Sequence, residues 1–313
     1  MKLLGLHHIT AIASDPQRNL DFYTQLLGLR FVKRTVNFDD PGSYHFYFGD
    51  RTGRPGTIIT FFPWPGARRG SRGTGQVVAA SFATAPGAIE YWKTRLKENH
   101  VLVEEIAPRF GDTALRLADP DGLLLEIIAS DHLKEVDLGY ASEVPPENAL
   151  HGFHAPTLAV QAFAPTEALL TGTLGFESSA EEKGRRRFSL ESGSTTKHLD
   201  LIEQSDTSFG NIAAGTIHHI AFRVRDLEEQ LRFRETLLAQ GLHVTPVVDR
   251  QYFHSIYFRE PGGILLEIAT DGPGIATDES VEHLGESLRL PPQFETRRDL
   301  IEKTLPPLFL PNK

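Results

Sequence analysis

The sequence contains no cysteine. This absence excludes disulfide bonds, thiolate catalysis, zinc fingers and cysteine-ligated iron–sulfur clusters. Long hydrophobic runs are lacking too: we find neither a stretch of about 18 apolar residues, as a transmembrane helix needs, nor a signal-peptide pattern at the N-terminus. We therefore expect a cytoplasmic protein that does not associate with a membrane.

Positive charge is also in short supply. The 313 residues include 32 Lys and Arg against 41 Asp and Glu, which gives a net charge of −9. Because nucleic-acid binding needs a basic face, we expect no nucleic-acid partner. Hydrophobic residues make up 40% of the chain, enough for sizeable cores, and the length predicts about two domains.

Internal repeats are the strongest signal in the chain. Residues 119–127 read Asp-Pro-Asp-Gly-Leu-Leu-Leu-Glu-Ile, and residues 260–268 read Glu-Pro-Gly-Gly-Ile-Leu-Leu-Glu-Ile. Each segment is an acidic-Pro-x-Gly turn followed by an apolar run with one glutamate, Glu126 or Glu267. Pro and Gly favour a turn, and the apolar run predicts a buried strand.

Two further segments begin alike. Residues 6–10 read Leu-His-His-Ile-Thr, and residues 217–221 read Ile-His-His-Ile-Ala. Each is followed by a helical pattern, and the first of these has Pro16 at a position suited to a helix N-terminus. On this frame the chain divides into four units, each predicted as a strand, a helix and three strands, at about 4–63, 75–130, 150–204 and 216–270.

These units predict an α+β fold. One βαβββ unit is too small to close its own core, so we expect the units to pair into two curved mixed sheets with helices outside. Such a sheet has a concave face, the usual place for a ligand. We assign an N-terminal domain to residues 1–140 and a C-terminal domain to 141–313. The segment from about 274 to 313 lies outside the repeat, and we expect it to cover a sheet edge or a pocket mouth.

The repeat frame also predicts a metal site. Side chains alternate along a strand, so each unit directs only certain residues into the concave face. The first-strand positions are His8, Ala79, His154 and His219, and the last-strand positions are Thr60, Glu126, Asp200 and Glu267. If the first and last units pair, the ligands are His8, His219 and Glu267. Two histidines and one carboxylate leave open positions and suit non-haem Fe(II); Mn(II) accepts the same ligands, and so does Zn(II).

Alternatives remain open from the residues alone. A single strand histidine is more often structural than a ligand, although a buried unpaired carboxylate is costly and therefore rarer. If the middle units form the site, the rival set is Glu126, His154 and Asp200. In regular strands His7 and His218 point to the opposite face, unless a local bulge redirects one of them.

The paired repeats and their His-His and Leu-Leu-Glu-Ile motifs resemble the vicinal-oxygen-chelate superfamily, which groups glyoxalases, bleomycin resistance proteins and dioxygenases. Within it, the chain most resembles hydroquinone-type extradiol ring-cleaving dioxygenases. Residues 28–35, 44–48 and 53–57 carry that likeness, and the resemblance covers about residues 1–272.

The resemblance implies a metal held by His8, His219 and Glu267. It implies a functional Tyr257 and Arg250, and it places His7 and Thr10 near the substrate or the metal. From the residues alone, Tyr257 lies on the strand that precedes the Glu267 strand, so it can reach the same concave face.

The implied function is that of a non-haem Fe(II)-dependent ring-cleaving dioxygenase acting on a hydroquinone- or catechol-type diol with O2, expected as a homodimer. One alternative is a glyoxalase-like lyase or isomerase, which usually needs a carboxylate from each paired unit; Thr60 at that position counts against it. The other is a small-molecule-binding resistance protein without catalysis, a class that rarely keeps a metal triad.

Overall fold

The structure, a computed structural model, describes residues 1–133, 135–191 and 197–310. Each predicted unit is present as a strand, a helix and three strands. Unit one contains β1 (Leu6–Ala13), α1 (Pro16–Asp21), β2 (Arg30–Val36), β3 (Tyr44–Gly49) and β4 (Ile58–Pro63). Unit two contains β5 (Gln76–Thr84), α2 (Ile89–Glu98), β6 (Val103–Arg109), β7 (Asp112–Ala118) and β8 (Leu124–Ala129). Unit three contains β9 (Thr157–Val160), α3 (Phe163–Gly172), β10 (Phe176–Glu182), β11 (Arg185–Leu190) and β12 (His198–Glu203). Unit four contains β13 (Thr216–Val224), α4 (Leu227–Ala239), β14 (Val248–Asp249), β15 (Phe253–Arg259) and β16 (Leu265–Pro273).

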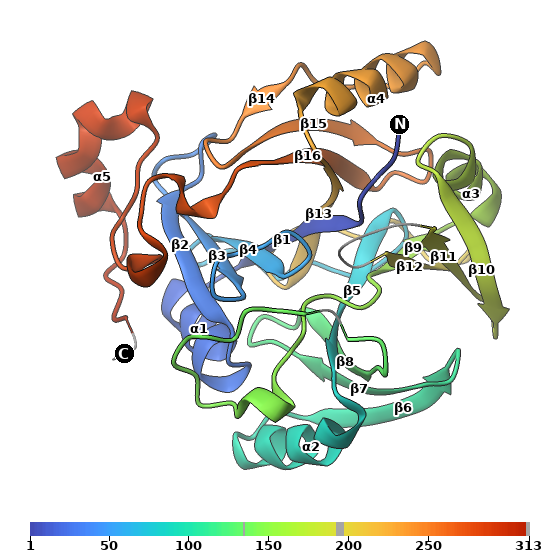
Figure 1. Cartoon of the computed structure of the whole chain (residues 1–313), viewed down its shortest axis with the longest axis horizontal. Coiled ribbons are helices and arrows are strands. Elements are labelled where there is room, and N and C mark those ends of the chain that lie inside the picture. The colour runs from blue at the N-terminus through green and yellow to red at the C-terminus, as the bar shows by residue number, and fades with distance from the viewer. Residues whose placement is uncertain (134, 192–196, 311–313) are drawn as a thin grey trace.

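The units pair first with last and second with third. One eight-stranded sheet has the order β14-β15-β16-β13-β1-β4-β3-β2, and the other has the order β10-β11-β12-β9-β5-β8-β7-β6 (Figure 1). Within a unit the first and last strands run parallel, whereas the two units of a sheet meet at an antiparallel pair, β1 with β13 or β5 with β9. The predicted fold class is therefore confirmed.

Residues 1–140 and 141–313 contribute one unit each to both sheets. The division into domains at residue 140 stays a prediction, because sheet membership and independent folding are different properties.

The repeated acidic turn has a structural purpose. Asp119 and Glu260 each accept hydrogen bonds from the backbone N–H groups two and four residues later, at 2.8–3.0 Å. Each also accepts a hydrogen bond from the helical segment of the preceding unit: Tyr23 donates to Asp119 at 3.3 Å, and Thr166 donates to Glu260 at 2.7 Å. Burial raises the pKa of Asp119 to about 7. The motif recurs because it closes a turn and ties two units together.

The helices lie around the outside of the molecule (Figure 1). Asp15 and Asp226 cap α1 and α4 by accepting a backbone hydrogen bond three residues on, at 2.8 and 3.0 Å, which satisfies a donor that the first turn leaves free. The inner faces carry large apolar side chains, including Trp92 on α2 and Phe233 and Leu237 on α4, all at most 1% exposed. None of the helices in the described part of the chain has the length and hydropathy needed to cross a membrane.

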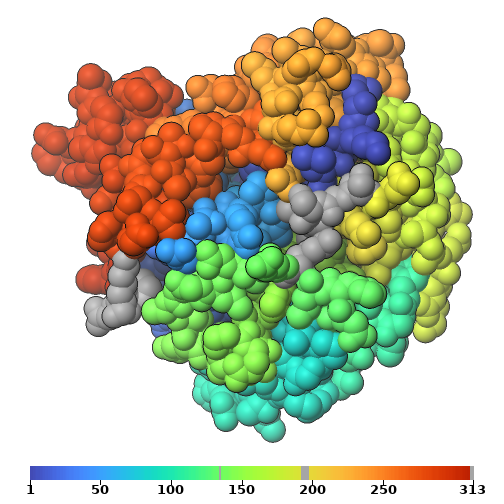
Figure 2. Space-filling view, in the orientation of Figure 1, coloured from blue at the N-terminus to red at the C-terminus, as the bar shows by residue number. Residues whose placement is uncertain are grey.

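The C-terminal segment packs along the edge of the first sheet. It contains three 3₁₀ turns (Ile275–Thr277, Val281–His283, Pro292–Arg297) and α5 (Arg298–Thr304), and it forms one flank of the molecule in Figure 2. Leu288 bridges to Arg34 of the edge strand β2. The Lys33 ammonium is fully buried and lies 2.5 Å from both Asp278 Oδ1 and Glu279 Oε2. The segment thus covers a sheet edge, as expected, and an internal ion pair anchors it there.

Candidate metal centre

The two His-His motifs meet at the centre of the first sheet, where β1 and β13 pair. The register shows one extra residue on each strand. His7 falls between the pairs Leu6–Phe222 and His8–Ala221, and His218 falls between the pairs that join Thr10 to His219 and Ala11 to Ile217. A bulge breaks the regular alternation and re-aims a side chain. Both His7 and His218 are therefore turned towards the histidine that follows them.

Three predicted ligands converge at this point. Glu267 Oε2 lies 2.9 Å from His219 Nε2 and 3.3 Å from His8 Nε2, and one ligand atom from each residue lies within 4.8 Å of the others. All three side chains are buried. Ser255 donates a hydrogen bond to Glu267 Oε1, but Oε2 has no hydrogen-bond partner. A buried carboxylate oxygen that makes no hydrogen bond is costly, and two imidazole nitrogens lie beside it, so the arrangement fits a cation between the three atoms.

The electrostatics favour a neutral His219 ring and an ionised Glu267 carboxylate. Burial lowers the pKa of His219, which keeps its ring neutral at neutral pH. Burial alone would raise the pKa of Glu267, but His8 and His219 outweigh that effect and hold it well below its ordinary value. Neutral imidazoles and an ionised carboxylate are the forms that bind a metal.

A second histidine supports each candidate ligand ring. The Nδ1 atoms of His7 and His8 lie 2.9 Å apart, and those of His218 and His219 lie 2.7 Å apart. Nε2 of His8 and His219 stays free for a metal when these two rings donate through Nδ1 and their neighbours accept. Burial lowers the pKa of His7 well below its ordinary value and that of His218 to about 3, so both neighbours are neutral and each can accept through one ring nitrogen. Sequence reasoning did not place His218 in the site, although its position in the repeated motif matches that of His7.

A cavity of about 420 Å³ opens from this cluster. The predicted residues Thr10, Tyr257 and Arg250 line it, whereas His7 is not among the lining residues and contacts His8. Aromatic side chains form much of the remaining wall: Phe38, Phe62, Trp64 and Phe253.

Arg250 and Tyr257 act as a pair on one wall. Arg250 Nε donates to the Tyr257 hydroxyl at 3.1 Å, and Arg250 Nη1 lies 3.3 Å from Asp39 Oδ2. Burial, reinforced by Glu267, raises the pKa of Tyr257, so the phenol keeps its proton. Since its oxygen already accepts from Arg250, its hydrogen is available to a ligand in the cavity.

The opposite wall holds a chain of polar side chains, of which the sequence reasoning placed only Thr10 and Thr60 at this face. Thr10 Oγ1 lies 2.8 Å from Thr60 Oγ1, which lies 3.0 Å from His45 Nε2. His45 Nδ1 lies 3.1 Å from the Tyr47 hydroxyl. The alternation of the Tyr-His-Phe-Tyr-Phe run on β3 could have indicated it, because that alternation puts His45 and Tyr47 on one face.

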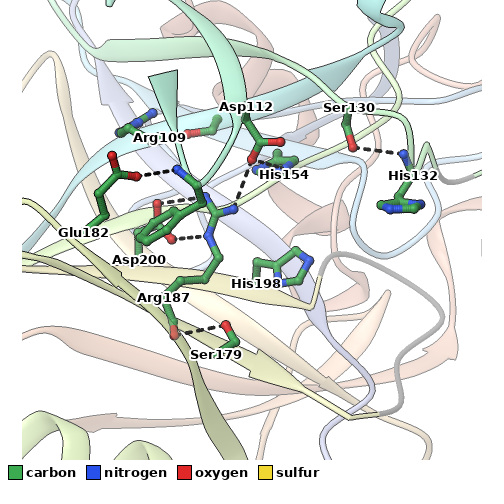
Figure 3. A network of polar contacts seen from close by, with 12 residues as sticks. Arg109, Asp112, Ser130, His132, His154, Ser179, Glu182, Arg187, His198 and Asp200 are labelled. Carbon is green, nitrogen blue, oxygen red and sulfur yellow. Dashed lines mark hydrogen bonds and ion pairs between the residues drawn. The ribbon is translucent and has the colours of Figure 1, made fainter. Parts of the chain in front are cut away.

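The rival set in the second sheet is not arranged to bind a metal. Glu126 Oε2 lies 2.5 Å from Arg109 Nη2, and Asp200 Oδ1 lies 2.7 Å from Arg187 Nε (Figure 3 shows the Arg187 side). Guanidinium groups thus neutralise both carboxylates. His154 Nε2 instead faces Asp112 at 3.5 Å. Within residues 1–133, 135–191 and 197–310, only His8, His219 and Glu267 form a group of three ligands close enough for one ion.

The repeat position assigned to His154 was wrong by one residue. On the parallel neighbour, Asp200 pairs with Thr157 in the same way that Thr60 pairs with Thr10. The residue two positions earlier, equivalent to His8, is therefore Ala155. The backbone before β9 is irregular. Unit three was aligned with the other units by matching His154 to His8, and that match did not give the correct strand register.

Known proteins share this architecture along the whole chain. The family model described as the Glyoxalase/Bleomycin resistance protein/Dioxygenase superfamily matches residues 5–127 and 152–268. The chain is 46% identical over 306 residues to "Putative ring-cleaving dioxygenase MhqO" of Bacillus subtilis (strain 168), with 98% of this chain and 97% of that protein covered. It is 34% identical over 309 residues to the "Chlorohydroquinone/hydroquinone 1,2-dioxygenase" of Sphingobium indicum, with 96% and 95% covered.

A solved structure agrees with these relatives. The crystal structure of a "putative dioxygenase from Bacillus subtilis subsp. subtilis str. 168" superposes with a TM-score of 0.95 at 45% identity and covers 100% of this chain and 99% of that one. The resemblance predicted from the sequence is confirmed, and so is the enzyme class, since relatives that span nearly the whole chain are named ring-cleaving dioxygenases. With its four repeats, its two paired sheets and these matches, the chain belongs to the glyoxalase/bleomycin resistance protein/dioxygenase superfamily.

Proposed function

We propose that this chain is a non-haem, Fe(II)-dependent ring-cleaving dioxygenase that acts on a hydroquinone-type diol. The observation that carries the proposal is the convergence of His8, His219 and Glu267 on one point beside the cavity, with Glu267 Oε2 buried and without a hydrogen bond. Two histidines and one carboxylate on one side of an ion suit Fe(II) with open positions, and Mn(II) accepts the same ligands. The names of the relatives support the ring-cleaving activity, and that of the Sphingobium protein supports the hydroquinone class.

Thr60 supports this proposal over a glyoxalase-like reaction. It is the unit-one counterpart of Glu267, because each pairs with the equivalent residue of its unit's first strand. A threonine that is hydrogen-bonded to Thr10 and His45 gives no anionic ligand. The metal would keep free positions on that side, as a reaction between two bound partners requires.

The protein's own residues would bind, orient and shield the substrate. Bound Fe(II) would supply the redox chemistry that joins an aromatic diol to O2. The cavity has room for one substituted ring, and Phe62 and Trp64 offer aromatic faces for it to pack against. The Tyr257 hydroxyl would donate a hydrogen bond to a substrate oxygen, and the Arg250 charge would stabilise negative charge that develops on oxygen.

The decisive experiment measures oxygen consumption. Protein loaded with Fe(II) under anaerobic conditions is mixed in air with hydroquinone, methylhydroquinone or catechol. We expect uptake of one O2 for each hydroquinone consumed and a new absorbance band from the ring-opened product. Free Fe(II) and the Glu267→Gln variant serve as controls, and a parallel Mn(II) series tests the choice of metal.

A different outcome would redirect the assignment. If no diol causes O2 uptake while the loaded protein turns over a hemithioacetal, the glyoxalase-like alternative holds instead. The cytoplasmic location and the homodimer stay predictions.

A further inference from the structure

Four side chains form a continuous hydrogen-bonded chain in one wall of the cavity, which Thr10, His45 and Tyr47 line. It runs from Tyr47 through His45 and Thr60 to Thr10, with steps of 3.1, 3.0 and 2.8 Å. Tyr47, Thr60 and Thr10 are at most 1% exposed. Thr10 lies on β1 two residues after His8 and pairs across the sheet with His219, so the chain ends beside the candidate ligands.

The distances allow two orders of the hydrogens along this chain, and the first begins at the Tyr47 hydroxyl. Burial, with Tyr257 adding to it, raises the pKa of Tyr47 well above its ordinary value, so the phenol keeps its hydrogen. His45 Nδ1, 3.1 Å away, can accept that hydrogen. Burial also lowers the pKa of His45 well below its ordinary value, so the ring is neutral and carries one hydrogen. With Nδ1 accepting, that hydrogen is on Nε2.

In this order the remaining steps follow from the first. His45 Nε2–H donates to Thr60, so the hydrogen of the Thr60 hydroxyl is left to donate to Thr10. The hydrogen of the Thr10 hydroxyl has no partner within the chain and is directed to the cavity that Thr10 lines. In the opposite order His45 Nδ1–H donates to Tyr47, whose own hydrogen then turns to the cavity that Tyr47 also lines. The first order is the one that places a donor beside the candidate metal ligands, where an ionised diol oxygen would bind.

We infer that Tyr47, His45 and Thr60 are positioning residues that hold Thr10 as a hydrogen-bond donor, so this wall of the cavity selects an oxygen that accepts. The ligand group that fits is an ionised hydroxyl of an aromatic diol rather than a neutral hydroxyl that must donate. The nature of the ligand rests on the proposed function. The order of the hydrogens along the four hydrogen-bonded side chains can be measured without any ligand.

The first test reads the hydrogen order directly, in metal-free protein. Long-range ¹H–¹⁵N NMR of histidine rings separates the Nε2–H from the Nδ1–H tautomer, and the His45→Gln variant identifies the His45 signals. We expect a single Nε2–H form in the wild type and a mixture of both forms in Tyr47→Phe. Tyr44→Phe is the matched control, since it removes a tyrosine hydroxyl of the same strand that bonds outside the cavity, to the Pro306 carbonyl at 2.9 Å. An Nδ1–H form in the wild type, or no change in Tyr47→Phe, would overturn the inference.

The second test uses the Fe(II)-loaded protein and hydroquinone. His45→Leu breaks the chain, and we expect kcat/KM to fall by about tenfold or more, because a hydrogen bond to a charged oxygen loses its orientation. His45→Gln keeps one acceptor and one donor on its amide and should recover most of that loss. Tyr47→Phe should lose about threefold to tenfold, and Tyr44→Phe should behave as the wild type.

The outcomes separate the two proposals. Equal losses in His45→Gln and His45→Leu would contradict the positioning role even if the diol is the substrate. A wild-type protein that consumes O2 with no diol would contradict the proposed function, and the NMR result would then decide the hydrogen order by itself.

Discussion

The Nδ1 atoms of His218 and His219 lie 2.7 Å apart on β13 and repeat the 2.9 Å contact of His7 and His8 on β1. In each pair the bulge residue supports the candidate ligand. The same local arrangement therefore occurs twice in the site, once on β1 and once on β13.

Removing either supporting ring should weaken metal binding. We expect His7→Leu and His218→Leu each to reduce the affinity for Fe(II) or Mn(II) by about 10- to 100-fold, because the ligand ring loses the contact that fixes its orientation and tautomer. Competition against a chelator measures this. His283→Asn, which changes a surface histidine paired with Glu286, is the control. Wild-type affinity in both leucine variants would show that the paired rings do not orient the ligands.

The placement of the metal can be tested with two glutamates at equivalent repeat positions. Glu267→Ala should lose metal binding, by more than the roughly 100-fold expected for a supporting residue, because it removes a ligand. Glu126→Ala should keep the metal, because Glu126 is paired with Arg109. Metal content after dialysis and thermal unfolding are measured together, so that a folding defect is recognised. Metal loss in Glu126→Ala alone would move the site to the second sheet.

The repeats explain why much of the architecture was predictable. Turn residues and apolar runs recur, so the four units and the succession of strands and helix along each unit follow from the sequence. Matching positions in the first and last units led to His8, His219 and Glu267 without knowledge of the contacts. The error at His154 and the uncertainty over His7 and His218 have another origin, since a bulge or an irregular entry to a strand is set by pairing across the sheet. The hydrogen-bonded side chains from Tyr47 to Thr10 could not be predicted for the same reason, because they come from three strands that pair only in the folded sheet.

The anchor of the C-terminal segment should contribute strongly to stability. Lys33→Met would leave Glu279, which is 1% exposed, without its closest cation, and we expect the free energy of unfolding to fall by about 3–5 kcal/mol. Urea unfolding of the metal-free protein measures this. The double variant Lys33→Met/Glu279→Gln should recover a substantial part of the loss, because the unpaired charge is also removed. Simple additivity of the two single variants would contradict a coupled pair.

His154, in the second sheet, should make the free energy of unfolding depend on pH. Burial, reinforced by Arg187, lowers the pKa of His154 to about 4, whereas an unfolded histidine titrates near 6.5. Between these values the unfolded chain binds more protons at this residue, so its contribution to stability falls as the pH falls from about 6.5 towards 4. The slope is at most about 1.4 kcal/mol for each pH unit.

The comparison of variants isolates this contribution, because Asp119, with its pKa raised to about 7, acts in the opposite direction in both proteins. Urea unfolding of the metal-free wild type and of His154→Asn at pH 7, 6 and 5 should show a flatter dependence in the variant. Parallel curves would show that His154 does not titrate as described.

The pairing of the first unit with the last also sets when the site can form during synthesis. His8 leaves the ribosome early, but its partner strand β13 and the Glu267 strand β16 belong to the last unit to emerge. A nascent chain that ends after unit three holds only one of the three candidate ligands. The candidate site therefore cannot be completed before unit four has been translated, and a product that stops earlier lacks two of the three candidate ligands.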